Sequence, residues 1–132
     1  MSTNNQFNGK SYDEVWSDRF TFFQENGEPS SKKFKEAFKS LPSIKKLRIN
    51  INFYAFLFGF IYFLIKGMWK GAITLILIAA VLITISVFTP DFVGSIISFF
   101  IAYLGAFTAN YTYYRKEVLN EDDFNIFKGM RF

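Results

Sequence analysis

Residues 71–114 read GAITLILIAAVLITISVFTPDFVGSIISFFIAYLGAFTANYTYY, and this stretch decides the fold. Asp91 is its one charged side chain, so helices formed from it have no charged face to turn toward water. As helices, residues 71–89 and 92–114 would be roughly 28 Å and 34 Å long, and the hydrocarbon core of a bilayer is about 30 Å thick. Thr89-Pro90-Asp91 lies between them and indicates a helix start, with the threonine as N-cap, the proline first and the aspartate in the first turn. The stretch therefore predicts a tight transmembrane helical hairpin.

Charged side chains are scarce through the middle of the chain. Residues 51–114 hold three of them, whereas residues 1–50 hold fifteen. A soluble domain places polar side chains along every helix, so this distribution is typical of a membrane domain over residues 51–114. We expect residues 1–50 to form a cytoplasmic amphipathic and basic segment, and residues 115–132 to form a cytoplasmic tail.

A basic block precedes the first apolar residues. Residues 32–48 contain seven lysine and arginine side chains and one glutamate. Such a block directly before an apolar region is typical of a juxtamembrane segment that faces anionic lipid headgroups. Nucleic-acid binding is the rival interpretation, and the position beside a membrane segment argues against it. We therefore expect the lipid bilayer and its anionic headgroups as partners, and no nucleic acid.

The first apolar stretch, residues 51–65, has two possible roles. As a helix it would be roughly 22 Å long, which is short for a membrane span of about 30 Å. If it spanned, Lys66 and Lys70 would lie opposite the basic block of residues 32–48, against the cytoplasmic bias of basic residues. If only the hairpin spans, all these groups share the cytoplasmic side. We therefore favour a short aromatic helix that is re-entrant or interfacial, with a three-span arrangement as the alternative.

Aromatic and basic residues flank the hairpin at its cytoplasmic end. Trp69 precedes the first span, and Tyr111 with Tyr114 closes the second, as expected for an aromatic belt at one membrane surface. The neighbouring lysines are expected to contact lipid phosphates. The predicted membrane-interface residues are Lys66, Gly67, Trp69, Lys70, Tyr111, Tyr114 and Arg115.

Small residues recur along the second span. They are Gly94, Ser98, Ala102, Gly105 and Ala109. Small side chains at a spacing of about four residues let helix backbones approach closely in a membrane. The pattern indicates either a helix-packing face for self-association or a partner, or contact within the hairpin against Ala72, Ala79 and Ala80. We favour contact within the hairpin, because a tight hairpin already needs one close face.

Short helices are expected in the N-terminal segment. Residues 1–10 are polar and are expected to lack stable structure. Ser11-Tyr12-Asp13-Glu14 has capping-box spacing, which predicts a helix with the serine as N-cap. A second helix is expected to start at Ser30 or Ser31 and to end at Pro42. Together with the hairpin, these elements predict an all-α integral membrane protein.

Side chains for catalysis or metal binding are few. Cysteine and histidine are absent, which excludes disulfides, thiolate nucleophiles and Cys/His metal sites. Carboxylate clusters can bind Mg²⁺ or Ca²⁺, but no calcium-loop spacing accompanies the acidic residues after the hairpin. We interpret those residues as a solvated tail that balances nearby basic side chains. They are Glu117, Glu121, Asp122 and Asp123. We expect no enzymatic activity, no cofactor and no metal.

A longer motif covers residues 48–71, which read RININFYAFLFGFIYFLIKGMWKG. It resembles the YigF/YigG-like family of small bacterial inner-membrane proteins, a domain of unknown function. The matching positions are Asn52–Phe56, Gly59, Tyr62 and Lys66–Trp69, with further likeness at Phe22–Gly27, Ala109–Tyr111 and Tyr114-Arg115. Phe60 stands where the family pattern has proline. The resemblance implies a multi-pass protein of the bacterial inner membrane. It does not indicate an activity, because none is assigned to the family.

The leading functional hypothesis is a small non-enzymatic inner-membrane protein that acts by protein–protein contact or self-association, as a homo-oligomer or in a larger complex. A small oligomeric channel or transport component is one alternative, although the interiors of both predicted spans lack ionisable side chains. A membrane sensor that binds anionic lipid through residues 32–48 is another.

Overall fold

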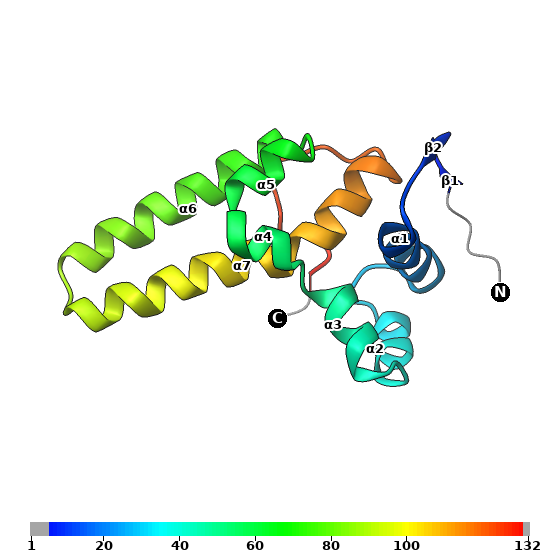
Figure 1. Cartoon of the computed structure of the whole chain (residues 1–132), viewed down its shortest axis with the longest axis horizontal. Helices are drawn as coiled ribbons and strands as arrows, with labels where there is room; N and C mark the ends of the chain where they lie inside the picture. The colour runs from blue at the N-terminus through cyan, green and yellow to red at the C-terminus, as the bar shows by residue number, and fades with distance from the viewer. Residues whose placement is uncertain (1–5, 131–132) are drawn as a thin grey trace.

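The computed structural model describes residues 6–130, and these residues are mostly helical (Figure 1). A long hairpin formed by α6 and α7 projects to one side, and the shorter helices gather around its other end. The elements within the described residues are β1 Gln6–Phe7, β2 Lys10–Ser11, α1 Glu14–Asn26, α2 Lys32–Lys39, α3 Ser43–Asn50, α4 Phe53–Phe58, α5 Phe60–Ile65, α6 Trp69–Val87 and α7 Asp91–Glu117.

The predicted hairpin is confirmed as a pair of long apolar helices, α6 and α7. By length and composition, both are able to cross a membrane. The predicted N-cap was wrong by one residue, because Pro90 (φ −59°, ψ 156°) occupies the cap of α7. The Thr89 hydroxyl instead donates to the Ser86 carbonyl at 2.8 Å, at the end of α6. Thr89 therefore closes one helix and does not open the next.

The aromatic stretch 51–65 is not one helix, as its sequence predicted, but two helices of six residues each. They are separated by Gly59, whose backbone (φ 56°, ψ −129°) lies in a region that glycine adopts readily and other residues avoid. The turn forms although Phe60 replaces the proline of the family pattern. Each helix is about 9 Å long, too short to cross a bilayer.

The segment containing α4 and α5 turns back on itself against α7. It enters at Asn52, whose backbone N–H donates to the Ala106 carbonyl at 3.0 Å. At the turn, a Cβ built on Gly105 would lie 3.9 Å from the Gly59 Cα. It leaves at Gly67, where a Cβ would lie 3.5 Å from the Lys116 Nζ. Both ends of the segment therefore lie toward the C-terminal end of α7.

Aromatic packing joins α1 to the C-terminal end of α7. The Phe20 ring lies 5.8 Å from that of Tyr113 and 5.6 Å from that of Tyr114. Phe23 continues this packing toward α2, where its ring stacks on Phe34 at 6.0 Å. Burying aromatic rings of this size is a major source of stability. We call α1, α2, α3 and the β1–β2 hairpin the cap.

The start of the cap differs from its prediction. Residues 6–11 form a β-hairpin rather than lacking structure, because Asn8 and Gly9 both adopt positive φ, as the tight turn between antiparallel strands requires. Residues 1–5 lie outside the described part of the chain. The N-cap of α1 is Asp13, which accepts from the Trp16 N–H at 2.9 Å, and the predicted cap Ser11 lies in β2. The predicted start of α2 is confirmed, with Ser31 as its N-cap.

We predict that Gly59→Ala lowers the free energy of unfolding by about 1–3 kcal/mol, because alanine is strained at this backbone conformation. The expected effect is purely conformational, since a Cβ at Gly59 would meet nothing within 4 Å. Thermal unfolding in detergent, followed by circular dichroism, measures the change.

Gly94→Ala is the matched control, because a Cβ there also meets nothing within 4 Å and Gly94 lies within α7. It is expected to leave stability unchanged or raise it by about 0.5–1 kcal/mol. Equal effects of the two variants would show that the turn at Gly59 is unimportant.

Candidate functional site

Buried polar side chains gather where the α4–α5 segment meets α7. The Asn52 amide nitrogen donates to the Tyr62 hydroxyl at 2.9 Å and to the Asn110 side-chain oxygen at 3.1 Å. The Asn52 side-chain oxygen accepts from the Ala55 N–H and so caps α4. Asn52 therefore joins both ends of the segment to α7.

Asn110 extends this connection to the cap. Its amide nitrogen donates to the carbonyl oxygens of Arg48 and Ile49, both at 3.0 Å. These carbonyls belong to the last turn of α3, where the helix leaves backbone acceptors without partners of its own. Asn52 and Asn110 are both almost fully buried, so their hydrogen bonds are made away from water and losing them would be costly. We call this pair the asparagine clip.

Lys66 lies against three aromatic rings from different elements. Its Nζ is 5.5 Å from the ring centres of Trp16 and Tyr113, and 5.8 Å from that of Tyr62. A cation over aromatic faces is attracted by about 0.5–2 kcal/mol, more as water is excluded. Lys66 thereby connects the end of α5 to the cap and to α7.

Arg19 is a second cation on the same tryptophan. Its guanidinium carbon lies 4.5 Å from the Trp16 ring centre, and its Nε donates to the Arg48 carbonyl at 2.8 Å. Burial lowers the pKa of Arg19, while the neighbouring Tyr62 and Asp13 raise it and Arg48 lowers it further. Positive charge is thus concentrated beside Trp16.

Arg115, at the end of α7, is buried and fully paired. It donates to Glu121 at 3.0 Å, to Asp123 at 2.6 Å and to the Asn125 carbonyl at 2.8 Å. The hydrogen bond from Arg115 lowers the pKa of Glu121. Burial raises the pKa of Asp123, but the hydrogen bond and charge of Arg115 outweigh it and the net shift is downward. Both carboxylates stay ionised at neutral pH and hold the C-terminal tail against α7.

Acidic residues after the hairpin pair with basic side chains, as we interpreted them from the sequence. Glu121 also pairs with Lys128 at 3.1 Å, and Glu117 pairs with Lys10 and Lys116. No group of three or more acidic side chains within residues 6–130 is arranged to hold a metal ion.

The predicted membrane-interface residues fall into two groups. Lys66, Gly67, Trp69 and Lys70 lie at the molecular surface between α5 and the start of α6. Lys70 also donates to the Asp122 carbonyl at 2.9 Å, which fixes the tail beside it.

Tyr111, Tyr114 and Arg115 form the second group, and these three are buried. The expectation that they face lipid headgroups is not met, because α1 and the tail pack over them. The Phe23 ring, for example, lies 5.1 Å from that of Tyr111 and 5.3 Å from that of Tyr114.

The small residues of α7 likewise fall into a buried group and a more accessible group along the helix. Gly105 and Ala109 are buried, and a Cβ on Gly105 would approach the Ala55 carbonyl oxygen at 3.4 Å. Gly105 thus meets the α4–α5 segment as well as Leu75 of α6. Ser98 is exposed, and Gly94 and Ala102 are half-buried. Of the five predicted packing residues, Gly94, Ser98 and Ala102 therefore stay accessible to another helix.

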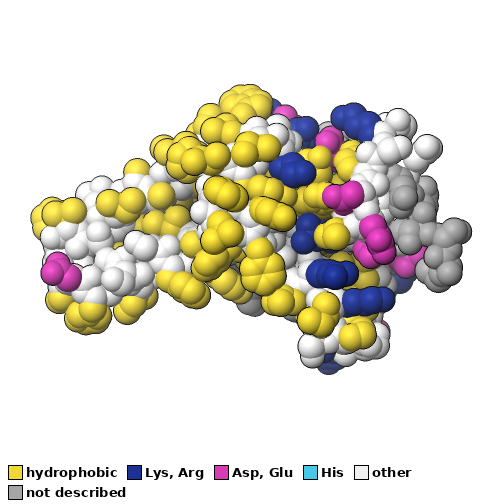
Figure 2. All heavy atoms as spheres, viewed as in Figure 1, with side chains coloured by type: hydrophobic (Ala, Val, Ile, Leu, Met, Phe, Trp, Pro, Cys, Tyr) yellow, Lys and Arg dark blue, Asp and Glu magenta, His cyan; other side chains and the backbone are white. Residues whose placement is uncertain are grey.

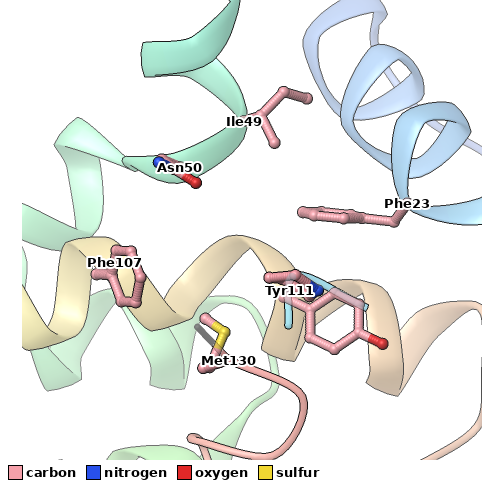
Figure 3. A pocket seen from close by; sticks show the side chains of 7 residues that line it. Phe23, Ile49, Asn50, Phe107, Tyr111 and Met130 are labelled. Carbon is pink, nitrogen blue, oxygen red and sulfur yellow. The ribbon is translucent and has the colours of Figure 1, made fainter. Parts of the chain in front are cut away.

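A shallow pocket lies between α1, α3, α7 and the C-terminal tail (Figure 3). It is lined by Phe23, Pro29, Ile49, Asn50, Phe107, Tyr111 and Met130. Its volume of about 220 Å³ includes space that is open to solvent, so the pocket encloses little room for a ligand. The lining has no charged side chain, so this pocket offers no chemistry for a reaction.

The sequence analysis did not predict two residues that connect α7 or α1 to the neighbouring helices, Asn110 and Arg19. Asn110 was noted only as part of a family motif, although an amide within an apolar helix needs a partner and was a usable signal. Arg19 gave no local signal, because its burial depends on α3 and α5, which lie far along the chain.

Comparison with known proteins agrees with the resemblance seen in the sequence. Residues 4–118 match the family described as "Protein of unknown function (DUF2628)". The "Uncharacterized protein YigF" of Salmonella typhimurium is 39% identical over 116 residues, covering 84% of this chain and 89% of the relative. The protein of the same name from Escherichia coli K12 is 34% identical with the same coverage. No solved structure matches.

We predict that Asn110→Ala lowers the free energy of unfolding by about 2–4 kcal/mol, because it removes three hydrogen bonds that join α7 to Asn52 and to the Arg48 and Ile49 carbonyls. Chemical denaturation in detergent measures the loss. Thr108→Val is the control, since Thr108 is equally buried but its hydroxyl bonds only the Leu104 carbonyl of its own helix. A loss no larger than that of the control would contradict a stabilising role for the clip.

Proposed function

This chain belongs to the DUF2628 family of proteins of unknown function, and from that premise we propose that it is a non-enzymatic protein of the bacterial inner membrane. In this proposal α6 and α7 span the bilayer, the α4–α5 segment enters and leaves through one leaflet, and the cap lies in the cytoplasm. The protein acts by binding other chains, or copies of itself, in the membrane.

The observation that carries the proposal is the apolar surface of the hairpin. In the most apolar 18-residue stretches of α6 and α7, only 17% and 28% of the residues are buried. The core helix of a soluble protein is, by contrast, mostly buried. Phe88, at the hairpin tip, is 85% exposed. Each such side chain gains about 1.5–3 kcal/mol when it leaves water, so lipid is the solvent that fits this surface.

Charge supports the same arrangement. Figure 2 shows hydrophobic side chains over the hairpin and the middle of the molecule, with Lys and Arg side chains in a band at the border of the cap. Such a band suits the anionic headgroups of a cytoplasmic leaflet. Asp91 lies at the opposite end of the hairpin, where no basic side chain accompanies it.

Contacts between the two ends of the chain support two membrane crossings rather than three. The Asn8 amide donates to the Glu117 carbonyl at 2.7 Å, and Lys10 pairs with the Glu117 carboxylate at 3.4 Å. The start of the chain and the end of α7 therefore meet. Three crossings would put them on opposite sides of a bilayer.

The binding role is supported by small, accessible residues in the N-terminal half of α7. A Cβ on Gly94 would meet nothing within 4 Å, and Ser98 is exposed. Small residues in this position let a second helix approach closely in lipid. The absence of histidine and cysteine, and the pairing of the tail carboxylates with basic side chains, support a role without catalysis.

For membrane topology, we predict that cysteines placed singly at Lys33 and Asp122 react with an impermeant maleimide from the cytoplasmic side, and one at Asp91 from the other side. All three positions are exposed, and the natural chain has no cysteine to interfere. Labelling of intact cells and of inverted membrane vesicles measures accessibility. Lys33 and Asp122 on opposite sides would contradict two crossings.

For association, we predict that Ser98→Cys forms cross-linked dimers in native membranes, and that adding Gly94→Leu reduces their yield about three- to tenfold by blocking close approach. Leucine at Gly94 should not disturb the chain's own packing, because nothing lies within 4 Å of the Cβ position. Ile85→Cys, on exposed α6, is the control. Equal cross-linking from Ser98 and Ile85, or no effect of Gly94→Leu, would contradict an association face on α7.

A further inference from the structure

We propose that Arg19, Arg48 and Lys66 bind the phosphate group of an anionic phospholipid headgroup. The inference rests on the membrane location proposed above, and it names a specific lipid site within it. The three cations come from three elements: α1, α3 and the turn after α5.

Arg19 is the centre of the site, because it contacts both Trp16 and the last turn of α3, and Lys66 lies against the same tryptophan. Arg19 and Lys66 lie 4.5 Å and 5.5 Å from the Trp16 ring centre. Arg48 is joined to Arg19 through its carbonyl oxygen, which accepts from the Arg19 Nε at 2.8 Å, and its own side chain is exposed. The backbone of Arg48 thus positions Arg19, while its guanidinium remains at the surface.

Arg19 lacks the countercharge that the chain provides for its other buried arginine. Arg115, 2% exposed, pairs with two carboxylates. Arg19, 9% exposed, forms no ion pair within the described residues, and neither do Arg48 and Lys66. The carboxylate of Asp13 acts on Arg19 only at longer range, because it caps α1. A nearly buried cation without a countercharge is costly, and an anion at this place reduces the cost.

The surroundings of the site favour a lipid over a soluble phosphate. The α4–α5 surface beside it is apolar and open, with Phe53, Tyr54 and Ile65 each at least 60% exposed. Ile44 and Leu47 of α3, the helix that carries Arg48, are exposed as well. A headgroup phosphate on the cations would leave acyl chains against these side chains, so one molecule satisfies both surfaces.

Removing only the charge of Arg48 tests the site with little risk to folding. Arg48→Gln keeps the backbone carbonyl that Arg19 and Asn110 use. Lys66→Gln is the second variant. Lys33→Gln is the matched control, because it removes one positive charge from an exposed position on α2, outside the proposed site.

The measurement is native mass spectrometry of the full chain in dodecyl maltoside, titrated separately with phosphatidylglycerol, with phosphatidylcholine of the same acyl chains, and with inorganic phosphate. We expect wild type to retain phosphatidylglycerol in preference to phosphatidylcholine. Arg48→Gln and Lys66→Gln should each weaken this binding about five- to tenfold, and Lys33→Gln should not change it.

Three outcomes would overturn the site. The first is equal binding of the two lipids, the second is an equal effect of Lys33→Gln and Arg48→Gln, and the third is displacement of phosphatidylglycerol by inorganic phosphate, which would indicate a soluble ligand. Each of these leaves the membrane location intact, because cysteine labelling tests that separately.

Discussion

The C-terminal half of α7 is the surface on which the rest of the chain is assembled. The cap packs its aromatic rings there, the α4–α5 segment bonds to it through the asparagine clip, and the tail is held to its end by Arg115. The N-terminal half of the same helix has no such cover. One continuous helix therefore has one end covered by the rest of the protein and one apolar end that the described residues leave largely exposed.

Buried and half-buried cations in the structure have two kinds of partner, carboxylates or aromatic rings, and the kind depends on where the cation lies. Arg115 lies beneath the tail, where carboxylates neutralise it. Arg19 and Lys66 lie at the border of the exposed apolar surface, where aromatic rings hold them in place and supply no full negative charge. Rings stabilise a cation without neutralising it, so the border remains electropositive and open to an anion.

Sequence periodicity was sufficient for the long helices and insufficient for the contacts between them. Residues 71–114 predicted α6 and α7 because apolar length and a proline-marked turn are local properties. The turn at Gly59 was missed as a break because an aromatic run on both sides of a glycine also suits a continuous helix. The burial of Tyr111, Tyr114 and Arg115 was missed because the covering helix α1 is about ninety residues away in the chain, beyond any local pattern.

The asparagine clip also sets an order of events during synthesis. Asn52 leaves the ribosome before its partner Asn110, which follows 58 residues later. Until α7 has been made, the α4–α5 segment has neither the amide nor the Ala106 carbonyl that hold it. The aromatic segment can therefore form these contacts only after α7 has been made. A truncated chain ending before Asn110 would lack both contacts and leave the segment without its hydrogen bonds to α7.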